Sequence, residues 1–136
     1  MMTLSTTEIL QIVYDSLMNS ALGIQVPTVY KYKHVLNPSG EFIVVMPLAN
    51  EINNSQVAVV NVNLYVPDKI ETVNKKTQRF PDDERLNELT RLAMEALEAG
   101  YRTQERYWFR VISEEIISDD NISYSFSNIK IKLINY

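Results

Sequence analysis

Apolar residues at helical spacing predict a first helix near the start of the sequence. Ser5 and Glu8 have the S-x-x-E spacing of a capping box, in which each side chain satisfies a backbone N–H group near the other. Apolar side chains then recur at intervals typical of one helix face: Ile9, Ile12, Val13, Leu17 and Ala21. Gly23 follows them, and a glycine at this place predicts the end of the helix.

A second amphipathic helix is predicted after Pro81. Its first turn holds the three carboxylates of residues 82–84, which suit the positive end of the helix dipole. The buried stripe consists of Leu86, Leu89, Ala93, Ala96 and Leu97. Gly100 is placed to end this helix, and both helices should pack on a sheet.

Five segments show the alternation that is typical of β-strands. They are "TVYKYKHV" (28–35), "EFIVVMPLA" (41–49), "QVAVVNVNLYVPD" (56–68), "ERYWFRVISEEII" (105–117) and "ISYSFSNIKIKLINY" (122–136). The turns "NPSG" and "NEINNSQ" favour an antiparallel meander for the first three strands, and "SDDN" joins the last two as a hairpin. The sequence therefore predicts one α+β domain over residues 1–136, with a mainly antiparallel sheet in the order α-β-β-β-α-β-β and two packed helices.

Two local features predict irregularities in these strands. Pro47 cannot donate to a strand ladder, which predicts a bulge or a strand end there. In the last segment the apolar spacing shifts by one residue at Ser127–Asn128, which predicts a second β-bulge.

The segment 67–81, between the third strand and the second helix, has no clean period. We expect a long, mobile loop, because connections of this length are uncommon unless they are mobile or functional. Four basic residues make the segment locally positive in an acidic chain: Lys69, Lys75, Lys76 and Arg79.

The strand at 56–68 has two faces without charge. One face carries Ala58, Val60, Val62, Leu64 and Val66 and belongs to a core. The other face consists of Val57, Val59, Asn61, Asn63 and Tyr65, whereas a face that meets only water would usually carry charged residues. Two interpretations stay open. Either one helix covers each face of the sheet within a single chain, or one face or edge of the sheet meets a neighbouring subunit.

Composition narrows the function classes. The chain has 136 residues, 46% of them hydrophobic, a net charge of -4 and no cysteine. An acidic balance argues against a dedicated nucleic-acid binder, which needs a basic surface. Without cysteine there is no disulfide framework, thiolate metal site or cysteine nucleophile. Neither a signal peptide nor an apolar stretch of membrane-spanning length is seen, so the expected location is cytoplasmic.

Candidate chemistry is sparse. The single histidine, His34, lies between lysines in a predicted strand, where a structural role is the more common one. The carboxylates of residues 82–84 are better explained by the helix dipole than by a cation site. Only three glycines occur, at helix ends and in a turn, so a phosphate-binding loop is not available. We therefore expect a protein that is not an enzyme and that holds no cofactor or metal.

The layout resembles a known family, the tail terminator proteins of tailed bacteriophages, also called tail-completion or head–tail joining proteins. The resemblance rests on a capped first helix, a long central hairpin that ends in "VNVNLYVPD", a loop that leads to "PDDERLNELTRLAMEAL", and a final hairpin. It covers residues 5–133 and depends on element order and strand character, because the family offers no catalytic motif to compare.

The resemblance implies a structural protein of the virion, assembled in the host cytoplasm. Such proteins form a ring, typically a hexamer, that caps the tail tube and joins it to the head. By position, Lys69, Lys75, Lys76 and Arg79 would contact a partner or the lumen, where passive contact with DNA stays open. Val57, Val59, Asn61, Asn63 and Tyr65 would form a subunit interface. The alternatives are another phage neck, connector or tail-tube protein, or a monomeric α+β binding module.

Overall fold

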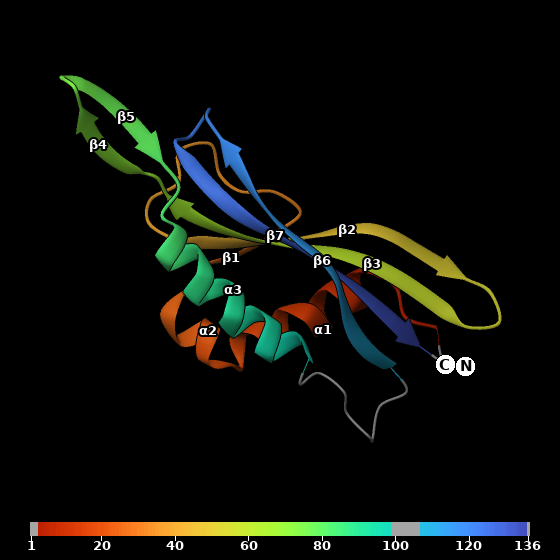
Figure 1. The fold of residues 1–136 in the computed structure, drawn as a ribbon. Helices are drawn as coiled ribbons and strands as arrows, with labels where there is room; N and C mark the ends of the chain where they lie inside the picture. The colour runs from red at the N-terminus through yellow and green to blue at the C-terminus, as the bar shows by residue number, and fades with distance from the viewer. Residues whose placement is uncertain (1–2, 99–106, 136) are drawn as a thin grey trace.

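The computed structural model describes residues 3–98 and 107–135, and it places three helices against one β-sheet (Figure 1). The elements are α1 (Thr6–Met18), α2 (Ala21–Gln25), β1 (Val29–Lys31), β2 (Phe42–Ile52), β3 (Gln56–Pro67), β4 (Lys69–Val73), β5 (Lys76–Phe80), α3 (Asp83–Glu98), β6 (Tyr107–Asp119) and β7 (Tyr124–Asn135). Five strands form one sheet in the order β1-β2-β3-β7-β6, while β4 and β5 pair separately. The predicted α+β class is confirmed.

The start of α1 is the capping box that the sequence predicts. The Ser5 hydroxyl oxygen accepts a hydrogen bond from the Glu8 backbone N–H at 3.1 Å, and the Glu8 carboxylate accepts one from the Ser5 N–H at 3.0 Å. The apolar face of the helix is buried through Ile9, Leu10, Val13 and Leu17. Local sequence therefore suffices to place the start of this helix.

The prediction that Gly23 ends the first helix is wrong. Helix α1 ends at Met18, and Gly23 lies inside the short helix α2, where it is buried. A Cβ atom at Gly23 would lie only 2.3 Å from the backbone carbonyl oxygen of Met18. The glycine is thus required for the close approach of α2 to the end of α1.

The predicted strand at 28–35 is shorter, and its pairing differs from the predicted meander. Strand β1 covers only Val29–Lys31 and runs parallel to β2, with Tyr30 opposite Val44. The chain leaves the sheet at Tyr32, whose φ of 76° lies in the left-handed region. Because parallel neighbours need a connection that crosses over the sheet, residues 32–41 pass across one of its faces.

One predicted bulge is confirmed and the other is wrong. The β2–β3 register shifts between Pro47 and Ala49, as expected for a residue without an N–H group. In β7, by contrast, the described pairs with β3 keep one register through Ser127 and Asn128, and the second shift lies in β6 between Val111 and Ser113. The apolar spacing of β7 changes because its first half is apolar on one face of the sheet and its second half on the other.

The segment 67–81 differs from the irregular loop that the sequence predicts. Residues 69–80 form an antiparallel hairpin of β4 and β5, which we call the arm. Asn74 and Lys75 have φ values of 53° and 66°, the left-handed pair that defines a type I′ turn. The usual sequence of such a turn is Asn-Gly. Here it is Asn-Lys, so the sequence does not predict the turn. The mobility of this segment stays a prediction.

Helix α3 is close to its predicted form. The Asp82 carboxylate accepts a hydrogen bond from the Arg85 backbone N–H at 3.2 Å, which is the N-cap geometry. Of the predicted stripe, Leu86, Leu89, Ala93 and Leu97 are buried. Gly100, predicted to end this helix, lies outside the described residues. No helix among the residues described is long and apolar enough to span a membrane.

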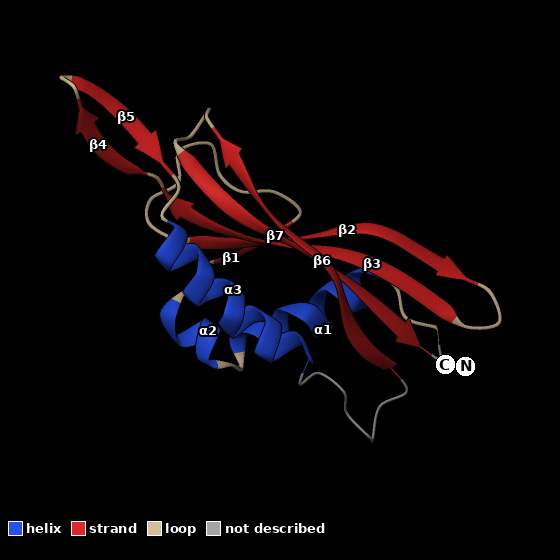
Figure 2. Cartoon of the chain, viewed as in Figure 1, coloured by secondary structure: helices blue, strands red, loops and turns tan. Residues whose placement is uncertain are grey.

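The described helices all pack on the same face of the sheet, which we call the inner face (Figure 2). One apolar core joins them to it, with Val13 of α1, Leu22 of α2 and Leu89 of α3 in the same cluster as Val60 and Ile131 of the sheet. The interpretation in which one helix covers each face is therefore wrong. The opposite face, here called the outer face, has no described helix on it.

Candidate functional site

One half of the outer face is closed by an aromatic cluster of the same chain. Phe42, Val44, Tyr65 and Tyr124 are buried there. The Phe42 and Tyr65 rings stack with their centroids 4.5 Å apart, and Phe126 stacks on the other side of Tyr65 at 4.6 Å. This cluster is a second, smaller core.

The crossing segment 32–41 covers this cluster. The His34 ring lies 5.4 Å from Phe42 and 5.3 Å from Tyr65, centroid to centroid. The Tyr124 hydroxyl donates a hydrogen bond of 2.9 Å to the Gly40 carbonyl oxygen. Burial, together with the nearby carboxylate of Asp119, raises the pKa of Tyr65 to about 12. His34 is thus part of the cover over the cluster.

Two of the predicted interface residues are covered within the chain. Tyr65 is only 6% exposed, and Asn63 only 4%. The Asn128 amide donates a 2.6 Å hydrogen bond to Oδ1 of Asn63, which joins β7 to β3 in the middle of the outer face. Neither Asn63 nor Tyr65 therefore needs a second subunit to remove it from water.

The other half of the outer face is open. Val57, Val59 and Asn61 are half-buried there, next to one another on β3. The β7 partners of these three residues are Ile134, Lys132 and Lys130, respectively. Two lysines therefore lie beside a strand that carries no charge of its own. The sequence could not show this, because β3 and β7 are far apart in the chain.

The neighbouring strands extend this surface. Trp108 and Arg110 of β6 lie opposite Ile134 and Lys132, and Met46 of β2 lies opposite Asn61. We call these residues together the open patch: Met46, Val57, Val59, Asn61, Trp108, Arg110, Lys130, Lys132 and Ile134. Its side chains are partly exposed, and all except the amide of Asn61 are apolar or basic. Oδ1 of Asn61 is buried and has no hydrogen-bond partner among the described residues.

The arm carries all the predicted loop residues on a surface that the rest of the described chain does not cover. All ten residues of β4 and β5 are exposed, with Ile70 at 63%. Figure 1 shows the arm reaching beyond the end of the sheet. Its base is tied to the body by a 3.7 Å ion pair between Lys69 and Asp82, whereas Lys75, Lys76 and Arg79 lie further along it.

Strand β6 presents a surface that sequence reasoning treated only as part of a hairpin. It is an edge strand of the sheet, and β7 is its one partner among the described strands. Ile112, Ile116 and Ile117 are exposed along it, beside the exposed carboxylates of Glu114 and Glu115. We call residues 112–120 the β6 edge. The adjacent pairs Glu114–Glu115 and Ile116–Ile117, next to the acidic turn, were the available signal.

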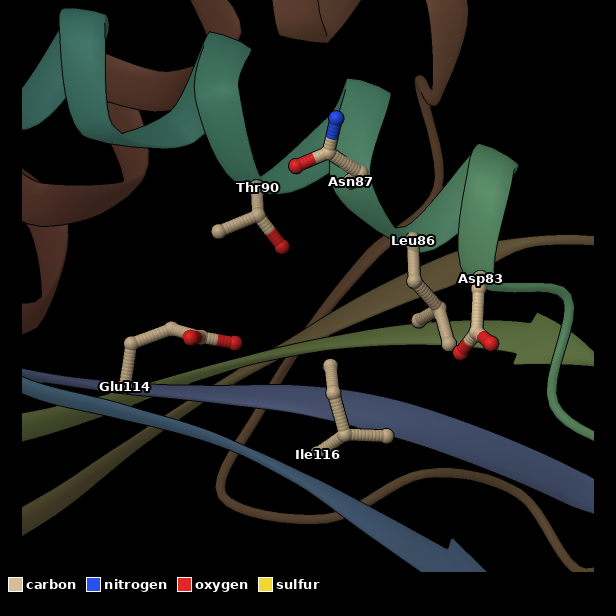
Figure 3. Close-up of a pocket in the computed structure, with 6 residues that line it drawn as sticks. All are labelled: Asp83, Leu86, Asn87, Thr90, Glu114 and Ile116. Carbon is tan, nitrogen blue, oxygen red and sulfur yellow. The ribbon is translucent and has the colours of Figure 1, made fainter.

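A shallow hollow of about 170 Å³ lies between α3 and this strand (Figure 3). It is lined by Asp83, Leu86, Asn87, Thr90, Glu114 and Ile116. On its floor the Thr90 hydroxyl donates to the Ser127 hydroxyl at 2.8 Å, and Ser127 donates to the Glu114 carboxylate at 2.9 Å. Two carboxylates beside aliphatic carbon suit a long basic side chain, because such chains combine an apolar stem with a charged end.

Arg85 forms the shortest ion pair among the described residues, and it joins three elements of the fold. Its guanidinium donates two hydrogen bonds to the Glu41 carboxylate, at 2.6 and 2.8 Å. A third bond of 2.8 Å reaches Gln25 at the end of α2. The hydrogen bonds to Glu41 are the main cause of a raised pKa for Arg85. The bidentate pair therefore fixes α3 and α2 to the start of β2.

Comparison of the sequence with protein-family models and with curated proteins finds no relative. No protein-family model matches the chain, and no curated protein is significantly similar to it in sequence. Among the residues that the structure describes, no three histidine or carboxylate side chains lie close enough together to hold a metal ion. The candidate site is thus a set of surfaces: the open patch, the arm and the β6 edge.

Proposed function

We propose that this chain is a structural assembly protein whose copies join into a ring, as the tail terminator proteins of tailed bacteriophages do. The observation that carries the proposal is the one-sided sheet. Its helices occupy the inner face, while the open patch on the outer face exposes tryptophan, methionine and valine side chains.

The composition of the open patch favours contact with protein. Tryptophan, methionine and arginine are enriched at protein interfaces. Trp108 and Arg110 lie on this patch at its β6 side, and Met46 lies at its β2 side. A buried acceptor without a partner, as at Asn61, costs on the order of 1–3 kcal/mol, and a donor from another subunit would remove this cost. Both features support a second copy on this face.

In the proposed role the ring caps the tail tube and offers the head a surface on which to dock. Its partners are copies of itself, the tail-tube protein and the head connector, and its place is the virion. This part of the proposal rests on the resemblance in element order, together with an arm that reaches away from the body and is free to meet a partner (Figure 1).

The first experiment measures the mass of the purified protein by size-exclusion chromatography with light scattering, and its shape by electron microscopy. We expect rings whose mass is a multiple of 15.7 kDa. Asn61→Glu should split them, because it would bury a carboxylate in the subunit contact. Asn54→Glu is the matched control, since Asn54 is exposed in the turn between β2 and β3.

The Asn61→Glu variant also tests the folding of the monomer. Lys130 lies opposite Asn61, so an added carboxylate has a cation beside it and the fold should stay intact. A monomer at every concentration would overturn the ring. Rings that leave the length of tail tubes unchanged, when added to polymerising tail-tube protein from the same genome, would overturn the terminator role alone.

A further inference from the structure

We infer that the arm of one copy docks on the β6 edge of the next copy and that this contact closes the ring. The inference deepens the proposed function and rests on it. It assigns the two surfaces, 69–80 and 112–120, to each other.

The arm lacks the packing that normally holds a β-hairpin. A lone two-stranded hairpin is at best marginally stable in water, and three or more strands or a packed helix are usually needed. Here every residue of β4 and β5 is exposed, including Ile70, Val73 and Phe80. Pro67 and Pro81 border the arm and separate it from the body of the chain. A hairpin of this kind gains most from a strand or surface supplied by another molecule.

The β6 edge also lacks a partner strand on one side among the described residues. An edge strand leaves backbone N–H and C=O groups unpaired, and natural proteins usually protect long apolar edges with charge, proline or a covering element. Strand β6 is 13 residues long, and Ile112, Ile116 and Ile117 are all exposed on it. A hairpin that adds its strand to such an edge satisfies the backbone of both partners.

Charge selects this pairing. The arm holds four basic residues and one acidic residue, a net charge of +3, and because the whole chain carries -4 the remainder carries -7. The β6 edge holds Glu114, Glu115, Asp119 and Asp120 and no basic residue, a net charge of -4. Opposite charges steer encounter and suppress wrong partners, so the arm fits a second copy of this chain.

The hollow beside the β6 edge offers a seat for one arm side chain. Glu114 and Ile116 belong both to the hollow and to the edge, and Asp83 adds a second carboxylate (Figure 3). Of the basic residues of the arm, Arg79 lies opposite the exposed Ile70, so one face of the arm presents an apolar and a cationic group together. That pair is complementary to the isoleucine and glutamate pairs of β6.

The geometry makes the contact head-to-tail. The arm and the β6 edge are different surfaces, and a contact between unlike surfaces continues from copy to copy until the rotation closes a ring. Within its own copy the arm points away from the five-stranded sheet (Figure 1). Each copy therefore gives one arm and receives another.

A cross-linking experiment tests the contact directly. The chain has no cysteine, so each introduced cysteine is the only thiol that can react. Thr77→Cys copies and Ser113→Cys copies are purified separately, mixed, and treated with a short bismaleimide linker. Only a link between molecules can join the two variants. Thr77→Cys mixed with Asn54→Cys is the control, since Asn54 lies in the turn at the far end of β2 and β3. We expect covalent dimers from the first mixture and not from the control.

Exchanging the charges of the two surfaces gives a second test. Recovery of assembly in the double variant could not result from a folding defect. An exposed ion pair strengthens binding by up to about fivefold, and a like-charge pair weakens it by a similar factor. Lys76→Glu and Glu115→Lys each change the first kind of pair into the second. Each should therefore raise the protein concentration at which half of the copies are assembled, roughly tenfold. Combining both substitutions in one chain restores opposite charges at every contact, and assembly should recover. Lys33→Glu, the same change at an exposed lysine outside the arm, should leave assembly unchanged.

The outcomes separate the inference from the proposed function. If wild-type rings form but the Thr77 and Ser113 variants link no better than the control, the arm contact is wrong and the ring stands. A protein that never assembles overturns both. If Lys76→Glu leaves assembly intact and instead abolishes binding of duplex DNA in a gel-shift assay, the arm is a nucleic-acid contact and the inference is overturned.

Discussion

The burial of Tyr65 in the closed half of the outer face can be tested through the pH dependence of stability. Its ring stacks between Phe42 and Phe126 and is 6% exposed, and burial raises the pKa of its hydroxyl from 10 to about 12, with Asp119 adding a smaller effect. The perturbation is Tyr65→Phe, which removes the titrating hydroxyl and keeps the ring. We expect the wild type to be selectively destabilised by alkali and the variant to lack that component.

The magnitude follows from linkage. The unfolded chain loses the Tyr65 proton near pH 10, whereas the folded protein keeps it until about pH 12. The contribution of this group to the free energy of unfolding is thus fully present below pH 10 and is lost as the pH rises to 12. A pKa difference of about two units corresponds to a total loss of about 3 kcal/mol over this window.

The assay is urea unfolding of both proteins at a series of pH values from 8 to about 12, at low protein concentration. Lysines and other tyrosines titrate in the same window, so the informative quantity is the difference between the two proteins. This difference should be flat below pH 10 and should then change by about 3 kcal/mol in favour of Tyr65→Phe. Asp119→Asn in the wild-type background should lower the folded-state pKa of Tyr65, so the loss should still begin near pH 10 but should end at a lower pH and be smaller in total.

A constant difference across the whole range would refute the reasoning. It would mean that the Tyr65 hydroxyl titrates alike in the folded and unfolded states, so the segment 32–41 would not close over the cluster in solution. Tyr65 would then be accessible to a partner, as a subunit interface at this residue requires.

The remaining predictions concern single contacts. Arg85→Lys keeps the charge but loses the bidentate bond to Glu41, and it should lower the free energy of unfolding by about 1–2 kcal/mol in urea titrations. Asn63→Ala leaves the Asn128 amide buried without its 2.6 Å acceptor and should cost about 1–3 kcal/mol by the same method; no loss would show that water reaches this pair. Gly23→Ala places a Cβ atom 2.3 Å from a backbone oxygen and should lower the melting temperature by several degrees, whereas an unchanged value would show that α2 shifts freely.

Local features of this protein could be read from its sequence because their causes lie within a few residues. The capping box of Ser5 and Glu8 and the stripe of α3 depend on neighbours along the chain. The same holds for the irregularity at Pro47, whose ring removes a donor whatever strand lies beside it. The alternation of residues 56–68 likewise showed that both faces of β3 avoid charge.

Three other features of the fold could not be read from the sequence pattern and appear only in the structure. Gly23 looked like a helix stop because its real neighbour, the Met18 carbonyl oxygen, is brought close by a turn between two helices. The shift of spacing in β7 looked like a bulge because sequence periodicity cannot tell a slip of register from a change in which face is buried. The hairpin at 69–80 was hidden because Asn-Lys replaces the usual Asn-Gly.

The candidate site shows the same division. Sequence placed Val57, Val59, Asn61, Asn63 and Tyr65 on one uncharged face, and the structure agrees that they share it. Tertiary packing then divided this face. An aromatic cluster closes over Tyr65, while lysines of β7 lie beside Asn61 and Val59 and leave them half open. The physical reason is that strand alternation depends on the backbone of one segment, whereas what covers a face depends on loops and strands from elsewhere in the chain.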